Sequence, residues 1–360
     1  AAAGPARRDG GLGSNEDFLR RAREGRGLTR PELAVLLATS KLALQDAIED
    51  GGLGLDPELE PDLIAAFPPA MQKKFKKPIE EHRLRGEIVA TKLANRIVNR
   101  LGVLHPFELA EEEGASLRDI AAMFVVAGRL FARPAIWEAF GTAAISEQAR
   151  LALLDEVAVA TRAQIADLLR VCRPDEGPGA LIARLKPGIA GLGRRTRKLL
   201  KGGARAQSGR IAAKLEEAGA PHDLAEKIVR IFELDGAVGL ADLGQRRGID
   251  ETELTHAFTH LGQELGLDWA QAVAARIVAG DPWERLLIAG LARDFQQLRL
   301  EFLARAEGKD PRAAVDAWLA DHGPRVAQFA ALVNRARKAS SPNAAMLAQI
   351  AGQARVLLGR

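Results

Sequence analysis

Apolar residues recur along most of the chain at every third or fourth position, which is the spacing of one face of an α-helix. No convincing run alternates apolar and polar residues in the way a half-buried strand does. The pattern therefore predicts an all-α fold built as a multi-helical assembly. The expected helices span residues 15–25, 30–49, 57–67, 78–101, 116–131, 146–171, 208–218, 222–233, 250–264, 268–279, 282–305, 311–320, 323–338 and 342–358.

Breakers rich in Gly and Pro separate these helices, among them GGLGLDP, FPPA, CRPDEGPG and GKDP. Together with the repeat and the charge pattern described below, they divide the chain into six expected segments. These are a flexible or partly helical N-terminal segment (1–25), an N-terminal helical subregion (26–77), a first helical repeat (78–176), a basic linker (177–214), a second helical repeat (215–305) and C-terminal helices (306–360).

The helix expected at 30–49 carries a strong start signal in the stretch LTRPELAVLLATSKLALQDAIE. Thr29 and Glu32 have the spacing of a capping box, in which the hydroxyl accepts from the third helical amide and the carboxylate accepts from the Thr29 amide. Leu28 and Leu33 flank this box as a hydrophobic staple. Pro31 falls in the first turn, where its missing N–H costs little.

The same helix is apolar on two sides. At about 100° per residue, Leu33, Leu37 and Leu44 share one face, and Val35 and Leu42 lie almost opposite. A helix that is apolar on two sides is usually covered on both. Either another helix of this chain covers the second side, or that side contacts a different domain. The second alternative makes Val35 and Leu42 candidate interdomain contacts and predicts that they are more exposed than the other three.

An internal duplication is the strongest signal of organisation in the sequence. GASLRDIAAMFVVAGRLF matches GIDETELTHAFTHLGQEL, LANRIV matches LAEKIV, and SEQARL matches DPWERL, in the same order. We infer two copies of a helical unit, at about 84–171 and 215–305, with chance similarity between Ala/Leu-rich helices as the alternative. The positions matched at a constant offset are Gly114, Asp119, Ile120, Phe124 and Gly128 against Gly248, Glu253, Leu254, Phe258 and Gly262.

The composition favours helices and excludes several classes of protein. Apolar residues make up 47% of the 360 residues, aromatic residues make up 4%, and Tyr is absent, so Ala and Leu must fill the core. The single cysteine, Cys172, excludes a disulfide framework and a cysteine-based zinc site. Because no apolar run reaches about 18 residues and no signal peptide is present, we expect a cytoplasmic protein without a membrane span. The chain lacks an initiator Met, and we expect it to be a piece of a longer polypeptide.

Motifs of catalytic and nucleotide-binding sites are missing from the sequence. There is no Walker loop, HExxH or GxSxG, and the glycine runs lack the GxGxxG spacing. His256 and His260 have the i, i+4 spacing of metal ligands. The duplication places Ala122 and Val126 at the same positions, which favours packing over metal binding. We therefore assign no catalytic, cofactor-binding or metal-binding residue.

Two features raise the question of nucleic-acid binding. LADLGQRRGIDETELTHAF has the outline of a helix-turn-helix, but Glu251 and Glu253 at the start of its second helix would repel phosphates. Residues 177–215 contain ten basic residues and no acid, whereas the whole chain carries a net charge of +4. Because this basic segment has no aromatic residue for base stacking, a solvated linker is favoured over docking on an acidic surface of another domain, and nucleic acid ranks third.

The helix expected at 78–101 carries a cluster of basic side chains. Arg85, Lys92 and Arg96 lie within about 40° of one another on one face. They either stay hydrated, form ion pairs with Glu80, Glu81 or Glu87 nearby, or contact a neighbouring domain. We include the three basic residues among the candidate interdomain contacts.

Several stretches resemble one known family. GRGLTRPELAVLLATSKLALQDAI and FPPAMQKKFKKPIEEHRLRGEIVATKLANRIVNRLG are similar to segments that follow the catalytic domain in the large bacterial NAD-specific glutamate dehydrogenases. EEEGASLRDIAAMFVVAGRLF and LGQELGLDW continue the similarity. The resemblance runs from about residue 15 to 305, is strongest over 26–131 and is weak through the basic segment.

The resemblance implies a long cytoplasmic enzyme that forms homo-oligomers and uses NAD to convert L-glutamate to 2-oxoglutarate and ammonium. The family's catalytic and dinucleotide-binding motifs lie upstream of the matched stretches, so this chain alone is expected to be inactive and to hold no cofactor. It implies a structural or regulatory C-terminal region, with the 26–77 subregion adjoining the upstream catalytic domain as its partner. The residues alone leave open a free-standing helical adaptor or a basic nucleic-acid-associated protein.

Overall fold

The computed structural model describes residues 11–143, 145–199, 202–234, 236–274 and 276–359, and the side chains of residues 195–207 and 282 lie outside the described part. Every regular element in these ranges is a helix, which confirms the all-α fold class. The chain divides into two compact units, Ala1–Val126 and Ala127–Arg360. The division falls inside helix α9 (Leu117–Leu130), whereas the sequence suggested boundaries near 77, 176, 214 and 305.

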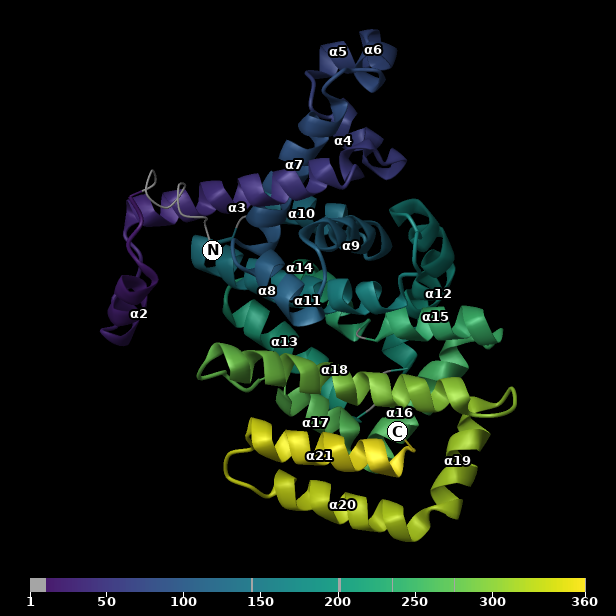
Figure 1. The fold of residues 1–360 in the computed structure, drawn as a ribbon. Coiled ribbons are helices and arrows are strands. Elements are labelled where there is room, and N and C mark those ends of the chain that lie inside the picture. Colours follow the sequence, from purple (N-terminus) through teal and green to yellow (C-terminus); the bar gives the residue numbers. More distant parts are fainter. Residues whose placement is uncertain (1–10, 144, 200–201, 235, 275, 360) are drawn as a thin grey trace. The chain divides into compact units, whose positions relative to one another are not determined.

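In the first unit, the long helix α3 packs along α7. Leu44 and Ile48 of α3 and Leu93 and Ile97 of α7 are fully buried and form the centre of this unit. Figure 1 shows α2 at one end of α3, and α4, α5 and α6 beyond the other. The helices of this unit are α2 (Asn15–Arg23), α3 (Arg30–Asp50), η1 (Leu53–Leu55), η2 (Pro57–Leu59), α4 (Glu60–Ile64), α5 (Pro69–Lys74), α6 (Lys76–Glu80), α7 (Arg85–Leu101), α8 (His105–Glu113) and the start of α9.

A close backbone contact holds η1 against α7. A Cβ atom on Gly54 would lie 2.5 Å from the carbonyl oxygen of Gly86, which no side chain tolerates. The breaker GGLGLDP therefore does more than end α3, because its glycine lets the chain turn back onto α7.

The second unit contains the remaining helices and two apolar clusters. One cluster joins α10, α11, α13 and α14 through residues such as Phe140, Leu153 and Ile228. The other joins α15 to α21 around Phe295 of α18, and Leu192 of α12 packs into it. The helices of this unit after α9 are α10 (Arg133–Thr142), α11 (Glu147–Val171), α12 (Pro178–Leu199), α13 (Gly202–Glu217), α14 (His222–Glu233), α15 (Ala237–Arg247), α16 (Glu251–Leu265), α17 (Leu267–Ala274), α18 (Pro282–Arg305), α19 (Pro311–Asp321), α20 (Gly323–Arg337) and α21 (Ala344–Leu357).

The expected helices with clear caps are confirmed, and the errors fall at short or breaker-rich stretches. The single helix expected at 78–101 is interrupted after Glu80 and resumes at Arg85. The helix expected at 57–67 is reduced to η2 and the short α4. Helices α5, α8, α10, α12 and α15 were absent from the expected set.

The basic linker expected at 177–214 is wrong over the described residues. Residues 178–199 form α12, and Leu181, Leu185 and Ile189 on one face of this helix are buried. These residues recur at the i, i+4 spacing of an amphipathic helix, so the basic side chains occupy the other faces. Arg194 is exposed as expected, and the expectation for residues 195–201 falls on side chains outside the described part.

The proposed duplication agrees with the structure at single positions. Phe124 and Phe258 are both buried, as are Ile120 and Leu254. Gly114 and Gly248 both end the preceding helix in the left-handed conformation, at φ 62° and φ 64°. These agreements concern local structure and helix ends.

The packing of the two copies differs. Helix α17 packs mainly against α18, whereas α10, which lies at the same place in the first copy, packs mainly against α14 and also contacts α11. An added Cβ on Gly262 would lie 2.7 Å from Arg299 Nη1, but one on Gly128 would meet nothing within 4 Å. A neighbouring side chain therefore comes close at Gly262 and not at Gly128, so the two matched glycines have different surroundings. The duplication is not confirmed and remains a prediction.

Candidate functional site

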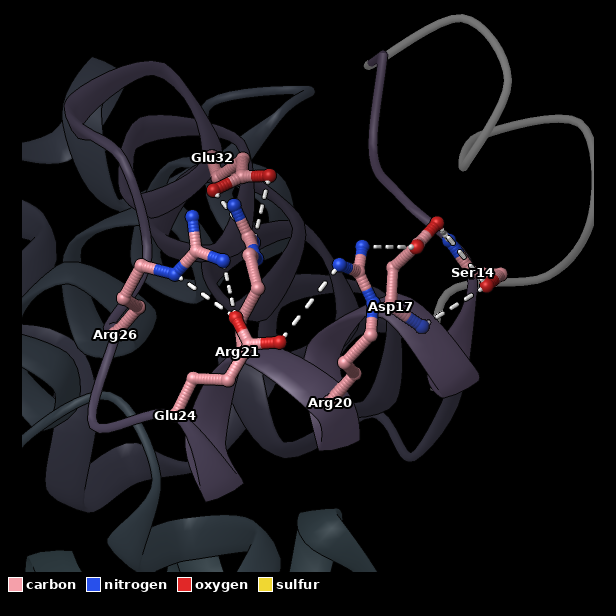
Figure 2. Close-up of polar contacts among 7 residues, drawn as sticks. All are labelled: Ser14, Asp17, Arg20, Arg21, Glu24, Arg26 and Glu32. Carbon is pink, nitrogen blue, oxygen red and sulfur yellow. Dashed lines mark hydrogen bonds and ion pairs between the residues drawn. The ribbon is translucent and has the colours of Figure 1, made fainter.

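The start of α3 is fixed by the expected capping box. Thr29 N donates to Glu32 Oε2 at 2.7 Å, and Glu32 N donates to Thr29 Oγ1 at 3.4 Å. Arg21 of α2 adds a two-pronged contact, because its Nη2 lies 2.9 Å from each carboxylate oxygen of Glu32 (Figure 2). The Thr29 amide and then the Arg21 guanidinium lower the pKa of Glu32. The box thus also anchors α2 to α3.

A second capping box starts α2. Ser14 and Asp17 exchange the same pair of contacts, and Arg20 Nη2 donates to Asp17 Oδ1 at 3.0 Å (Figure 2). None of the residues of α2 is buried, so polar contacts rather than core packing order this helix.

The side chains of α3 are buried only in the C-terminal half of the helix, and there only on the side of Leu44 and Ile48. Burial begins at Ser40 and includes Leu44, which is fully buried. Leu42 is 58% exposed and Val35 is partly exposed, so Leu42 is more exposed than Leu37 and Leu44 as expected. The expectation is wrong for Val35, because Val35 is only partly exposed whereas Leu33 is 51% exposed. Both residues lie in the first turns of α3, which contain no buried residue.

The three basic candidates on α7 have partners inside the first unit. Arg96 binds both oxygens of Asp62 on α4, at 2.6 and 2.8 Å. Lys92 Nζ donates to the carbonyl of Ala65 at 2.8 Å, and Arg85 Nη1 donates to the carbonyl of Glu80 at 3.1 Å. These contacts close α4 and α6 onto α7, which favours a structural role. Val35 and Leu42 therefore remain the stronger candidates for interdomain contact.

The histidine pair on α16 does not share one partner. His260 Nε2 lies 2.7 Å from Asp316 Oδ1 of α19, which links the two helices. The described residues contain no group of three or more His, Cys, Asp or Glu side chains placed to hold a metal ion.

Inside the second unit, α12 brings Arg184 into a buried ion-pair cluster. Arg184 Nε donates to Glu176 Oε1 at 2.7 Å, and its Nη2 donates to the Val171 carbonyl at 2.8 Å. Its Nη1 donates to Asp242 of α15, which also accepts from Arg246 Nε at 2.7 Å. The hydrogen bond from Arg184 lowers the pKa of Glu176. The cluster fixes the end of α11, the following loop, α12 and α15 together.

The single cysteine lies in the same loop. Cys172 caps the end of α11, and its Sγ lies 3.7 Å from the carbonyl oxygen of Glu176. It forms no disulfide and is only partly buried.

A second buried polar cluster runs along the centre of α11. Thr161, Gln164 and Asp167 recur every three residues and are all buried. Gln164 Oε1 accepts from Arg133 of α10, and Gln296 Nε2 of α18 donates to Asp167 Oδ2 at 3.0 Å. The cluster therefore joins α10, α11 and α18. Sequence reasoning missed it, although polar residues at this spacing among apolar ones in a long helix were a visible signal.

Within the described part of the chain, no single helix has the length and apolar composition needed to cross a membrane. One bent pair, α9 with α10, meets the criterion only when both helices are taken together.

The comparisons with known proteins agree with one another. The glutamate dehydrogenase, C-terminal, family profile matches residues 25–355. The NAD-specific glutamate dehydrogenase of Pseudomonas aeruginosa is 28% identical over 344 residues, which cover 94% of this chain and 21% of that protein. The protein of the same name from Halomonas elongata is 27% identical over 318 residues, covering 86% and 20%.

A third relative has the same printed name. The NAD-specific glutamate dehydrogenase of Mycobacterium tuberculosis is 28% identical over 353 residues, which cover 96% of this chain and 22% of that protein. The chain therefore spans about a fifth of the length of the curated relatives it matches. Since the profile covers nearly all of the chain, the chain belongs to the glutamate dehydrogenase C-terminal family.

Proposed function

We propose that this chain is a non-catalytic, structural or regulatory region of an NAD-specific glutamate dehydrogenase. The complete enzyme would convert L-glutamate to 2-oxoglutarate and ammonium with NAD, as a homo-oligomer whose cofactor site lies outside this chain. The relatives' names and the one-fifth coverage support the proposal. The clusters described above also support it, because their polar groups cap helices or join them to one another.

The proposal that this region positions the catalytic domain rests on one observation, the exposed apolar side of α3. Leu42 on this side is 58% exposed, and Val35 on the same side is partly exposed. Apolar surface of this kind is stabilised when a partner removes it from water. We assign that partner to the upstream catalytic domain of the same polypeptide, so that α3 positions the domain without taking part in the chemistry.

The alternative of a free-standing adaptor that uses the basic segment has less support. Arg184, which belongs to that segment, is bound by two buried carboxylates and is not available to a partner. No other described feature favours this alternative.

Charge substitutions in the complete enzyme test the docking proposal. The double substitution Val35→Asp and Leu42→Asp should leave the 360-residue chain folded, because neither side chain is buried. In the complete enzyme the same pair should lower the melting temperature and the rate of NAD-dependent glutamate oxidation, because two carboxylates would enter an apolar contact.

Leu151→Asp is the matched control, because Leu151 is 59% exposed on α11 of the other unit. It should change neither measurement. Full activity and stability of the complete enzyme with both α3 substitutions would contradict the docking proposal. It would not affect the assignment to a non-catalytic region.

A further inference from the structure

The start of α10 contains a buried positive charge with few partners. Arg133 is the first residue of this helix and is 3% exposed. Its Nη2 donates to Gln164 Oε1 of α11. Its Nε and Nη1 atoms are buried, and no acceptor among the described residues contacts them. A guanidinium has five N–H donors, so most of those on Arg133 are out of water without an acceptor.

Among the described residues, no carboxylate forms an ion pair with Arg133, and burial is the cause of its shifted pKa. The first turn of α10 contains no acidic residue, and Ala132 at the N-cap has no side-chain acceptor. Asp167, one turn beyond Gln164 on α11, accepts from Gln296 and pairs with Arg170. Burial lowers the pKa of Arg133 to about 9, so the group stays charged at neutral pH. An isolated buried charge is strongly unfavourable unless a counter-charge reaches it.

Two features at this point attract the same kind of ligand. The first turn of α10 has N–H groups without intrahelical acceptors at Arg133 and Ala135, while Pro134 has no N–H, and the helix dipole places partial positive charge there. A guanidinium adds a full charge and directional donors for an anion. We propose that Arg133 and the first turn of α10 bind a small monovalent anion, either chloride or the carboxylate of a small organic acid.

The position of Arg133 at the start of α10 limits the size of the ligand and indicates how it reaches the guanidinium. Ala132, Pro134 and Ala135 are exposed, so the surface lies next to the buried side chain. Ala132 itself has φ 50°, a left-handed conformation that non-glycine residues rarely adopt. A small anion that approaches through this turn stays next to the surface, whereas a larger ligand such as a nucleotide would have to open the helix packing.

Anion-dependent stability of the 360-residue chain tests the proposal, and the test does not depend on the proposed enzyme assignment. Melting temperatures are measured in sodium chloride, sodium acetate and sodium L-glutamate at matched ionic strength. For the wild-type chain, saturating anion at about 100 times Kd should raise the folded-to-unfolded ratio about 100-fold. Similar increases in melting temperature in chloride and in acetate would show that the site accepts any small monovalent anion. A larger increase in glutamate than in either of these salts would identify an organic acid as the ligand.

Arg133→Met should remove the anion dependence and make the anion-free chain more stable than wild type. Arg299→Met is the matched control, because Arg299 is another buried arginine but its Nε donates to the Phe295 carbonyl at 3.0 Å. This variant should be less stable and should keep the anion dependence. Since salts also act on the whole protein surface, the difference between the two variants, rather than the wild-type response alone, is the measure of binding.

Line broadening of the ³⁵Cl NMR signal gives a direct measure that does not require a folded Met variant. The wild-type chain should broaden the signal, and Arg133→Lys should weaken this effect because lysine lacks the planar fork of donors. Equal anion dependence in wild type and Arg133→Met, or no ³⁵Cl broadening combined with no response to either carboxylate, overturns the proposal. Buried water would then be what satisfies the guanidinium.

Discussion

The carboxylates of Glu176 and Asp242 are buried, and the guanidinium of Arg184 between them compensates their charge. Their side chains are 9% and 8% exposed, and that of Arg184 is 6% exposed. Removing one member of such a buried set leaves an uncompensated charge, which costs far more than losing a surface ion pair. The stability of the second unit therefore depends on the protonation state of the cluster.

The pH dependence of unfolding tests this dependence at Glu176. Its pKa is lowered below 4.5 in the folded chain, chiefly by the hydrogen bond from Arg184. A lowered folded pKa contributes stability that is present above the usual pKa and is lost as the pH falls through the folded value. The unfolding free energy of wild type should therefore exceed that of Glu176→Gln near neutral pH, and the gap should narrow as the pH falls from about 6 to about 3.

Urea titrations of both proteins at each pH give these free energies. Glu81→Gln, which removes an exposed carboxylate of the first unit, controls for the loss of one negative charge. A gap that stays constant over the whole pH range would show that Arg184 does not stabilise the ionised form of Glu176.

At the scale of single residues, the sequence was informative where the physics is local. The box at Thr29 and Glu32 was predicted with its atoms, because capping depends on residues three positions apart. The partners of Arg96 and Arg184 were not predicted, because Asp62 and Asp242 lie 34 and 58 residues away along the chain. Only the packing of helices brings such pairs together.

At the scale of elements, the start of α3 is held by its cap rather than by packing. Its first turns contain no buried residue, so Thr29→Ala should fray this end at a cost of roughly 1 kcal/mol. Amide hydrogen exchange should become faster from Leu33 to Leu37 and stay unchanged at the buried Leu44 and Ile48. Thr39→Ala, in the middle of the same helix, serves as the control. Unchanged exchange near Leu33 would mean that the contact from Arg21 alone fixes the start.

Helices α16 and α18 approach each other at Gly262. The guanidinium of Arg299 lies 3.9 Å from the centre of the Phe258 ring, and its Nε is bonded to the Phe295 carbonyl, so it cannot easily move away from an added Cβ. Gly262→Ala should therefore destabilise the chain by about 1–3 kcal/mol in chemical denaturation. Gly290→Ala should stabilise by about 0.4–1 kcal/mol, because a Cβ there meets nothing within 4 Å. Equal effects of the two substitutions would contradict this packing.

The error at α12 shows why the pattern of charges misled the prediction. Leu181, Leu185 and Ile189 have helical spacing, but Pro187 and the dense basic residues that follow from Arg194 are typical of a solvated linker. Burial of one face outweighed both signals, and the proline is accommodated inside the helix. Helix α10 was also missed, although the proline near its start favours the first turn of a helix.

At the scale of the whole molecule, the 360-residue chain should fold and should not oxidise glutamate. Hydride transfer needs a bound nicotinamide and a positioned proton-transfer group. The sequence lacks the motifs for both, and the described polar clusters join helices to one another. Absorbance of NADH at saturating L-glutamate and NAD is the measurement, with the complete enzyme as the positive control. Turnover by the purified chain would contradict the assignment to a non-catalytic region.

The position of Cys172 allows local opening of the loop after α11 to be followed by labelling of its thiol. As the only cysteine of the chain, it can be modified by a thiol reagent without any engineered substitution. The thiol is partly exposed, and its neighbour Glu176 is held by Arg184, so labelling should become faster when this junction opens. The rate of labelling under native conditions, compared with that of the unfolded chain, therefore reports on the protection of this one site. Repeating it in the presence of the upstream domain would show whether docking at a distance tightens the interior of the second unit.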